Sequence, residues 1–178
     1  MAQSHKTVGR RSFLAGSAGL ALAAGATTTA ARASQSSNPE TGFKFAVEKT
    51  PEEWKAQLGD DAFHILREGG TEFPTSSDYW AESKPGIYHC KGCDQALYTS
   101  EDYSLQEIGF VFFRHSLPFS IVLNKHTTDY NGAFPEPRDY IESVCSRCGG
   151  HLGHVLLVNK EVLHCINGTV LDLKPAEA

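Results

Sequence analysis

The sequence lacks features that mark membrane-spanning, repetitive and nucleic-acid-binding proteins. The apolar run near its N-terminus is too short and too weakly apolar for a comfortable membrane span, and no fixed-period repeat is visible. Basic residues are scarce after position 33: four of the 16 Lys and Arg lie before it, which leaves 12 against 21 acidic residues and a formal charge of −9 with His neutral. Such an acidic chain is poorly suited to bind nucleic acid or an anionic membrane.

The first 33 residues contain no acidic side chain and have the pattern of an export signal. Arg10 and Arg11 stand directly before an Ala- and Gly-rich apolar run, and the segment ends at a small-x-small cleavage pattern, residues 31–33. These features predict a twin-arginine signal peptide, with an uncleaved anchor as the alternative. We expect residues 34–49 to be a polar leader and residues 50–178 a single domain. Its expected location is periplasmic or extracytoplasmic, with no stable membrane insertion after signal cleavage.

Turn residues and alternating patterns predict a mainly β domain. Thr50 is placed to cap a helix, with Pro51 in its first turn and Glu53 completing a capping box, and a second short helix is expected across residues 60–70. From Gly86 onward the chain consists of short runs rich in β-branched and aromatic residues, separated by Gly, Pro, Asn and Asp. We therefore expect antiparallel sheets with helical turns packed against one end.

Cysteines are few, and their number is odd. Cys90 and Cys93 form one C-x2-C pair, and Cys145 and Cys148 form a second. Two such pairs supply four thiolates, the number that a tetrahedral zinc site needs. Two disulfides are the main alternative, because an exported protein meets an oxidising compartment. A redox-active pair is disfavoured, because the two pairs are symmetric.

Cys165 is the remaining cysteine, and it is either an inert buried thiol or a reactive one. Asn167 follows at the spacing that places both side chains on one face of a strand, and His151 and His154 come shortly after the second cysteine pair. A thiol near imidazoles can ionise and attack, and a protonated imidazole can give its proton to a departing oxygen. Together these residues favour a nucleophilic centre.

Several stretches of the chain, in order, resemble the methionine-R-sulfoxide reductases, the MsrB or SelR family. They span most of residues 50–170 and read "LREGGTEFP", "DYWAESKPGIYHCKGC", "ALYTS", "ESVCSRCGGHLGHV" and "HCING". The resemblance implies two antiparallel β-sheets with short N-terminal helices. It also implies a zinc ion held by the four paired cysteines, Cys90, Cys93, Cys145 and Cys148.

The resemblance also implies roles for the remaining site residues. Cys165 matches the family nucleophile, whose attack on the sulfoxide sulfur releases methionine and leaves a sulfenic acid. His151 and His154 match the histidines that handle the sulfoxide oxygen and its proton, and Asn167 matches a polar group that helps to hold them. The implied substrate is methionine-R-sulfoxide, free or in oxidised proteins.

The chain departs from the family pattern at three positions. Where the family has "GWPSF" this sequence reads "GFVFF", so Phe110 replaces the pocket tryptophan, and we expect Phe110 and Phe113 to line the substrate pocket. Leu163 replaces an arginine that favours the thiolate. Ile108 replaces a resolving cysteine, so turnover would need an external, thioredoxin-like thiol reductant.

These departures leave two further hypotheses beside the reductase. One is a zinc-stabilised binding module that uses the same scaffold with an altered pocket and little or no turnover. The other is a reductase for a different small oxidised substrate, selected by the aromatic run "FVFF".

Overall fold

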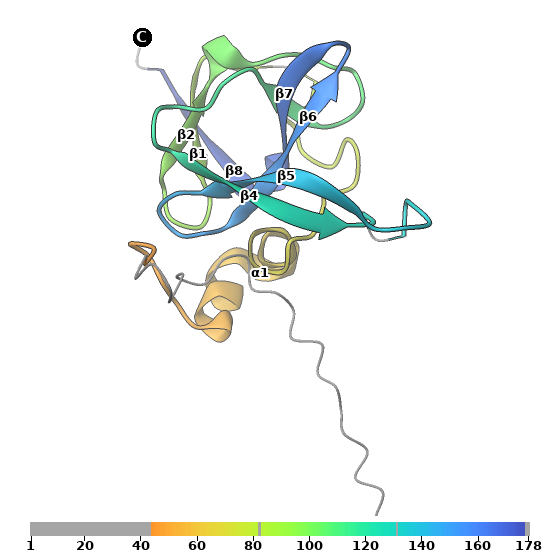
Figure 1. The fold of residues 1–178 in the computed structure, drawn as a ribbon. Coiled ribbons are helices and arrows are strands. Elements are labelled where there is room, and N and C mark those ends of the chain that lie inside the picture. The colour runs from red at the N-terminus through yellow and green to blue at the C-terminus, as the bar shows by residue number, and fades with distance from the viewer. Residues whose placement is uncertain (1–43, 82, 131, 177–178) are drawn as a thin grey trace, which may run out of the picture.

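A computed structural model describes residues 44–81, 83–130 and 132–176 (Figure 1). The expected signal peptide and most of the polar leader lie outside these residues. Within the described part of the chain, no helix combines the length and the hydropathy that crossing a membrane requires.

The helical part of the domain is α1, Pro51–Glu68, which begins and ends as the sequence predicts. The Thr50 hydroxyl accepts from the Glu53 amide while the Glu53 carboxylate accepts from the Thr50 amide, and Gly69 ends the helix in a left-handed conformation. The two expected helices join into one element with a break at Gly59, whose φ of 73° and ψ of 176° are not helical. Its apolar face buries Trp54 and Leu66 almost completely.

The expected mainly β architecture is confirmed: within the described residues, eight strands form two antiparallel sheets. The smaller sheet has the order β2-β1-β8, from Ala96–Thr99, Gly86–Cys90 and Leu171–Pro175. The larger has the order β3-β7-β6-β5-β4, from Val111–Phe113, Glu161–Ile166, His151–Val158, Arg138–Cys145 and Ile121–Thr128. Two 3-10 turns complete the elements, Ser100–Asp102 and Gly168–Val170.

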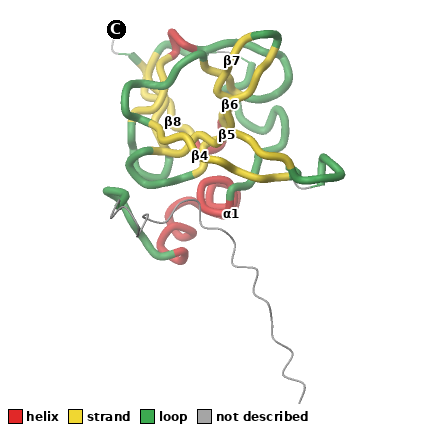
Figure 2. Tube along the Cα trace, viewed as in Figure 1, coloured by secondary structure: helices red, strands yellow, loops and turns green. Residues whose placement is uncertain are grey.

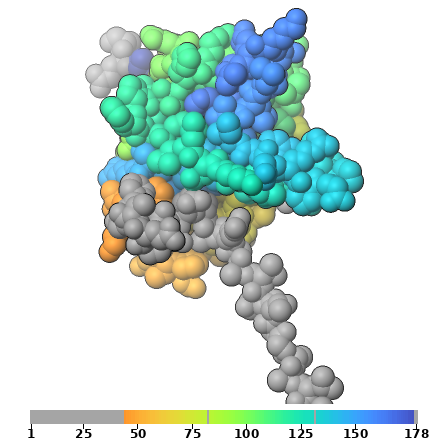
Figure 3. All heavy atoms as spheres, viewed as in Figure 1, coloured from red at the N-terminus to blue at the C-terminus, as the bar shows by residue number. Residues whose placement is uncertain are grey.

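The two sheets surround one apolar core, and α1 closes one end of it (Figure 2). In the core, Tyr98 stacks on Phe113 with ring centroids 4.3 Å apart, and Tyr88 meets the same ring edge-on. The space-filling view shows the orange part of the helical segment at the base of the molecule (Figure 3), and α1 packs against β6 and the turn Gly168–Val170. The helix end is thereby placed beside the larger sheet, where the candidate catalytic residues lie.

Candidate active site and metal centre

The four paired cysteines converge at one point between the sheets. Cys93 follows β1 and Cys145 ends β5, and each pair is folded by a tight turn in which the residue after the second cysteine adopts positive φ. These residues are Asp94, with φ 62°, and Gly149, with φ 69°. The two turns bring together chain segments that are more than 50 residues apart in the sequence.

The sulfur geometry fits a tetrahedral metal site. All four sulfur atoms lie within 4.8 Å of one another, with Cys90 Sγ 3.8 Å from Cys148 Sγ and Cys93 Sγ 3.5 Å from Cys145 Sγ. Four sulfurs about 2.3 Å from a central zinc ion stand about 3.8 Å apart. A disulfide needs about 2.05 Å, and all five cysteines are free thiols in the structure. The structure therefore does not support the alternative of two disulfides.

The surroundings of the thiol cluster suit four ligands that must lose their protons. The guanidinium of Arg67 donates to the carbonyl of Cys148 at 3.0 Å, and Arg147 donates to the carbonyl of Cys93 at 3.0 Å. Burial lowers the pKa of Arg67, and the nearby thiols, Cys148 first, oppose that shift. These cations offset the negative charge that four thiolates around a divalent ion retain.

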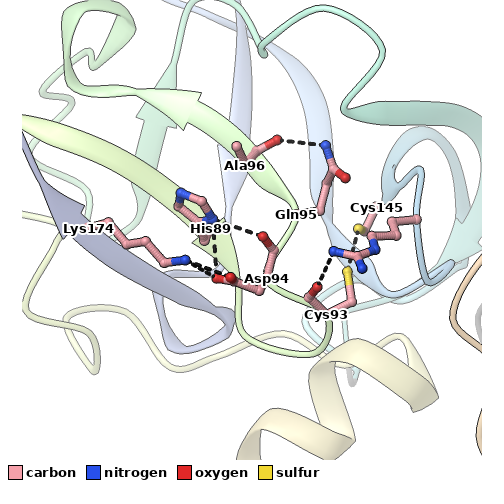
Figure 4. Close-up of polar contacts among 8 residues, drawn as sticks. His89, Cys93, Asp94, Gln95, Ala96, Cys145 and Lys174 are labelled. Carbon is pink, nitrogen blue, oxygen red and sulfur yellow. Dashed lines mark hydrogen bonds and ion pairs between the residues drawn. The ribbon is translucent and has the colours of Figure 1, made fainter.

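The first cysteine turn is fastened to the smaller sheet by ionic contacts (Figure 4). Lys174 of β8 contacts both carboxylate oxygens of Asp94, at 2.5 and 2.6 Å, and His89 contacts its carbonyl at 2.9 Å. The hydrogen bond from Lys174 is the main reason that the pKa of Asp94 lies below its usual value. The turn is thus held in place from outside as well as by its cysteines.

A second group of chemically active side chains lies on one face of the larger sheet. The strand register pairs Glu142 with His154, His154 with Cys165, and Cys165 with Phe112. Residues directly opposite in an antiparallel pair project from the same face, so these four form one row across β5, β6, β7 and β3. Cys165 is only partly buried and lies beside an imidazole, as a nucleophile requires.

His151 reaches the same face as His154, although two side chains three residues apart on a regular strand point to opposite faces. The pairing between β5 and β6 shifts at Ser143/Val144, and this irregularity turns His151 toward Glu142 while Leu152 enters the core. His151 Nδ1 lies 2.6 Å from the Glu142 carboxylate, and both side chains are almost inaccessible to solvent. This contact fixes the proton on Nδ1, so Nε2 carries a lone pair that can accept a hydrogen bond.

Asn167 supports the strand that carries the two histidines, and its hydrogen bonds within the described part of the chain go to the backbone. Its side-chain amide donates to the Leu152 carbonyl at 2.9 Å, and its side-chain carbonyl accepts from the Glu72 amide at 3.0 Å. Because Leu152 lies between His151 and His154, the amide fixes the strand that carries both histidines. Asn167 is therefore a positioning residue.

The Cys165 thiol is protonated at neutral pH in the resting protein. Burial raises the pKa of Cys165 to about 12, and the negative charge of Glu72 adds to the shift. Leu163, two residues earlier on the same strand, is fully buried and brings no cation. Burial also lowers the pKa of His154 to about 3, helped by His151 and His126, so this imidazole is neutral.

The two expected pocket phenylalanines are placed differently. Phe110 is partly buried and directly precedes β3, in register with the face that carries Cys165. Phe113 is fully buried, pairs with His164 and stacks on Tyr98, so the structure places it in the core on the opposite face from Cys165. Phe112, which pairs with Cys165, occupies the position that we expected of Phe113.

Three residues of this site were not found from the sequence. Glu142 orients His151, the Tyr130 hydroxyl lies 3.0 Å from His154 Nδ1, and His126 Nδ1 lies 2.9 Å from His154 Nε2. A carboxylate inside the otherwise β-forming run before Cys145 was the available signal for Glu142. His126 and Tyr130 become visible only once the pairing of β4 with β5 is known.

Comparisons with known proteins agree on one family. A profile described as the SelR domain matches residues 58–175. The chain is 37% identical over 136 residues to a protein named peptide methionine sulfoxide reductase B3 from Arabidopsis thaliana, covering 74% of this chain and 72% of that protein. It is 36% identical over 135 residues to one named peptide methionine sulfoxide reductase MsrB from Methanosarcina barkeri, covering 74% and 91%. A protein of that name from Azotobacter vinelandii is 34% identical over 134 residues, covering 74% and 96%.

Proposed function

This chain belongs to the SelR domain family, and on that premise we propose that it is a peptide-methionine (R)-S-oxide reductase acting on methionine-R-sulfoxide, free or in proteins. The observation that carries the proposal is the strand register that sets the partly exposed Cys165 directly opposite His154, on the face that also presents His151. A thiol enclosed in the core away from both imidazoles would have been inert.

The proposed reaction transfers one oxygen atom. The Cys165 sulfur attacks the sulfoxide sulfur, the sulfur–oxygen bond of the substrate breaks, and the oxygen ends on Cys165 as a sulfenic acid while methionine departs. The proton that leaves the Cys165 sulfur ends on the oxygen of the sulfenic acid. His151 and His154 are positioned to carry it to that oxygen as negative charge develops there. Cys165 is oxidised by two electrons, and the substrate sulfur is reduced by two.

Regeneration of Cys165 is proposed to need an external thiol. The other four cysteines are gathered in the thiol cluster, and the exposed Ile108 stands where a resolving cysteine would be expected. Two molecules of a monothiol, or one dithiol, then reduce the sulfenic acid to the thiol and release water and a disulfide. A thioredoxin-like protein is the proposed donor.

The thiol cluster is proposed to hold Zn²⁺ with Cys90, Cys93, Cys145 and Cys148 as ligands. The sulfur spacing and the neighbouring guanidinium groups support this assignment. With four protein ligands the ion has no open position, so it supplies stability and contributes no chemistry.

The activity is tested with the purified domain, dithiothreitol and the two epimers of methionine sulfoxide. We expect turnover of the R epimer only, and its complete loss in Cys165→Ser. Cys165→Ser should keep the wild-type zinc content and circular dichroism spectrum, which separates lost chemistry from lost folding. A folded, zinc-loaded wild-type domain without turnover of either epimer would reject the reductase and favour a binding module.

Export through the twin-arginine route is proposed on the sequence of residues 1–33 alone. The paired Arg10 and Arg11, the short apolar run and the cleavage pattern support a periplasmic or extracytoplasmic location. Cell fractionation of the full chain should find the processed protein outside the cytoplasm. A double Arg10→Lys, Arg11→Lys variant that is exported equally well would overturn this assignment.

A further inference from the structure

Three imidazoles, rather than the two expected, gather beside Cys165. His126 of β4 joins His151 and His154 of β6, and one nitrogen from each ring lies within 4.8 Å of the others. The rings of His126 and His154 stack with centroids 5.1 Å apart and planes 9° apart. The ring of His151 meets both at steeper angles, with centroids 5.4 and 5.1 Å away.

His151 directs an unused lone pair into this cluster. Its Nδ1 is held by Glu142 at 2.6 Å, and its Nε2 has no hydrogen-bond partner among the described residues although the side chain is 0% exposed. Leaving a buried acceptor unpaired is unfavourable, so this nitrogen points to a ligand that binds at the cluster. A carboxylate on the far nitrogen is also the usual arrangement of a metal-binding histidine.

His126 and His154 also direct ring nitrogens into this cluster. The Tyr130 hydroxyl contacts His154 Nδ1 at 3.0 Å, so His154 Nε2 is the nitrogen that faces the cluster, 2.9 Å from His126 Nδ1. One shared proton links these two nitrogens, and a metal ion would replace it.

The electrostatic surroundings favour a cation. The buried Glu142 carboxylate contacts His151 Nδ1, and the unused lone pair is on Nε2 of the same ring. The C-terminal end of α1 lies against the cluster as well, because a Cβ placed on Gly69 would be 3.6 Å from the His126 ring. Helix C-terminal carbonyls carry partial negative charge and attract cations.

We propose that His126, His151 and His154 form a second metal site, in which three imidazole nitrogens hold a divalent transition-metal cation such as Zn²⁺ and leave one coordination position open. Three histidines with an open fourth position are a known donor set for zinc, and imidazole also suits copper and nickel. The site is distinct from the thiol cluster in both its ligands and its location on the larger sheet.

The site has a regulatory consequence that rests on the proposed reductase function. The ion occupies the nitrogens that must meet the sulfoxide oxygen, so metal binding and turnover exclude each other. Free Zn²⁺ is then a competitive inhibitor of the reductase, and it acts without disturbing the structural ion.

The test is metal binding by the zinc-loaded protein, measured by titration calorimetry with Zn²⁺ and by metal analysis after gel filtration. Wild type should bind a second equivalent. His126→Phe keeps the stacked ring but removes a ligand, so its affinity should fall at least about 10-fold. His126→Asn serves as a second variant of different shape, and His115→Phe, which alters an exposed histidine elsewhere, should bind like wild type.

Cys165→Ser separates this proposal from the reductase. The variant should still bind the second ion, because the imidazoles hold it, while it has no turnover. A second equivalent that binds equally to wild type and both His126 variants, or that fails to bind wild type, overturns the metal site. Binding to a wild type that lacks reductase activity supports the metal site and rejects the proposed function.

Discussion

The thiol cluster and the histidine cluster contain similar numbers of metal-binding side chains but use them in opposite ways. The four sulfurs face one another across 3.5 and 3.8 Å contacts, and the turns that carry them are fastened by Arg147 and by the pairing of Lys174 with Asp94. The three imidazoles lie on one face of the larger sheet, with an unused nitrogen on His151 and a partly exposed thiol beside them. One cluster is closed, and the other is open toward a reactant.

This difference follows from where each cluster lies in the fold. The sulfurs come from two tight turns and from the strand ends that lead into them, where left-handed residues let two short segments fold back on a common point. The imidazoles come from strands, where the pleat holds side chains apart and presents them on one surface. Turns suit the enclosure of a structural ion, whereas a strand face suits a reactant that enters and leaves.

The largest expected effect is on the thiol cluster, which is the closed one. Cys145→Ser removes one of four thiolates, and we expect the domain to lose its zinc and its cooperative fold. A structural zinc ion contributes about 10–16 kcal/mol of binding free energy, which matches or exceeds the whole stability of a domain of this size. Zinc analysis and thermal unfolding followed by circular dichroism measure both losses. Cys165→Ser is the matched control, and a Cys145→Ser domain that melts like this control would show that the cluster is not structural.

An intermediate effect is expected at the open cluster. Glu142→Gln keeps the side-chain shape but replaces the carboxylate that orients His151, so kcat should fall about 10- to 100-fold while KM changes little. The fold and zinc content should stay at wild-type levels. Steady-state kinetics separate kcat from KM, and Glu161→Gln at an exposed position is the control. A rise in KM with unchanged kcat would assign Glu142 to substrate binding instead.

The closed cluster was the part of the site most accessible to sequence reasoning. A C-x2-C spacing is local, so both cysteine pairs could be recognised without knowing how the strands pair. The same holds for α1, whose capping box and terminal glycine are read from neighbouring residues. The strands were likewise found, because alternation and turn residues are local signals.

The open cluster depended on strand register, which the sequence does not reveal. Phe113 was assigned to the pocket, but its neighbour Phe112 is the residue paired with Cys165, and a shift of one residue moves a side chain to the other face. His126 joined the site only through the pairing of β4 with β5. The shift at Ser143/Val144 that turns His151 inward is a further feature that alternation cannot predict.

The smallest expected effect concerns the acidity of the open cluster's thiol. The pKa of Cys165 is raised to about 12, first by burial and then by Glu72. At any pH well below this value, the thiolate fraction increases about tenfold for each unit by which the pH increases. The rate at which iodoacetamide alkylates Cys165, followed by mass spectrometry of its peptide, should therefore increase about tenfold per unit between pH 7 and 9. A plateau within this range would mean that the thiol is already ionised.

Glu72→Gln sharpens this measurement, because it removes the charge that is the second cause of the raised pKa. Alkylation at pH 8 should become several-fold faster, a modest effect because burial remains. The Glu72 carboxylate also accepts from the Gly168 amide and from the Thr169 amide and hydroxyl, so the substitution loosens the chain after Cys165 as well. Thr169→Val removes the hydroxyl contact without changing charge. If it accelerates alkylation as much as Glu72→Gln, increased access explains the effect; if it does not, the charge of Glu72 itself restrains ionisation of the Cys165 thiol.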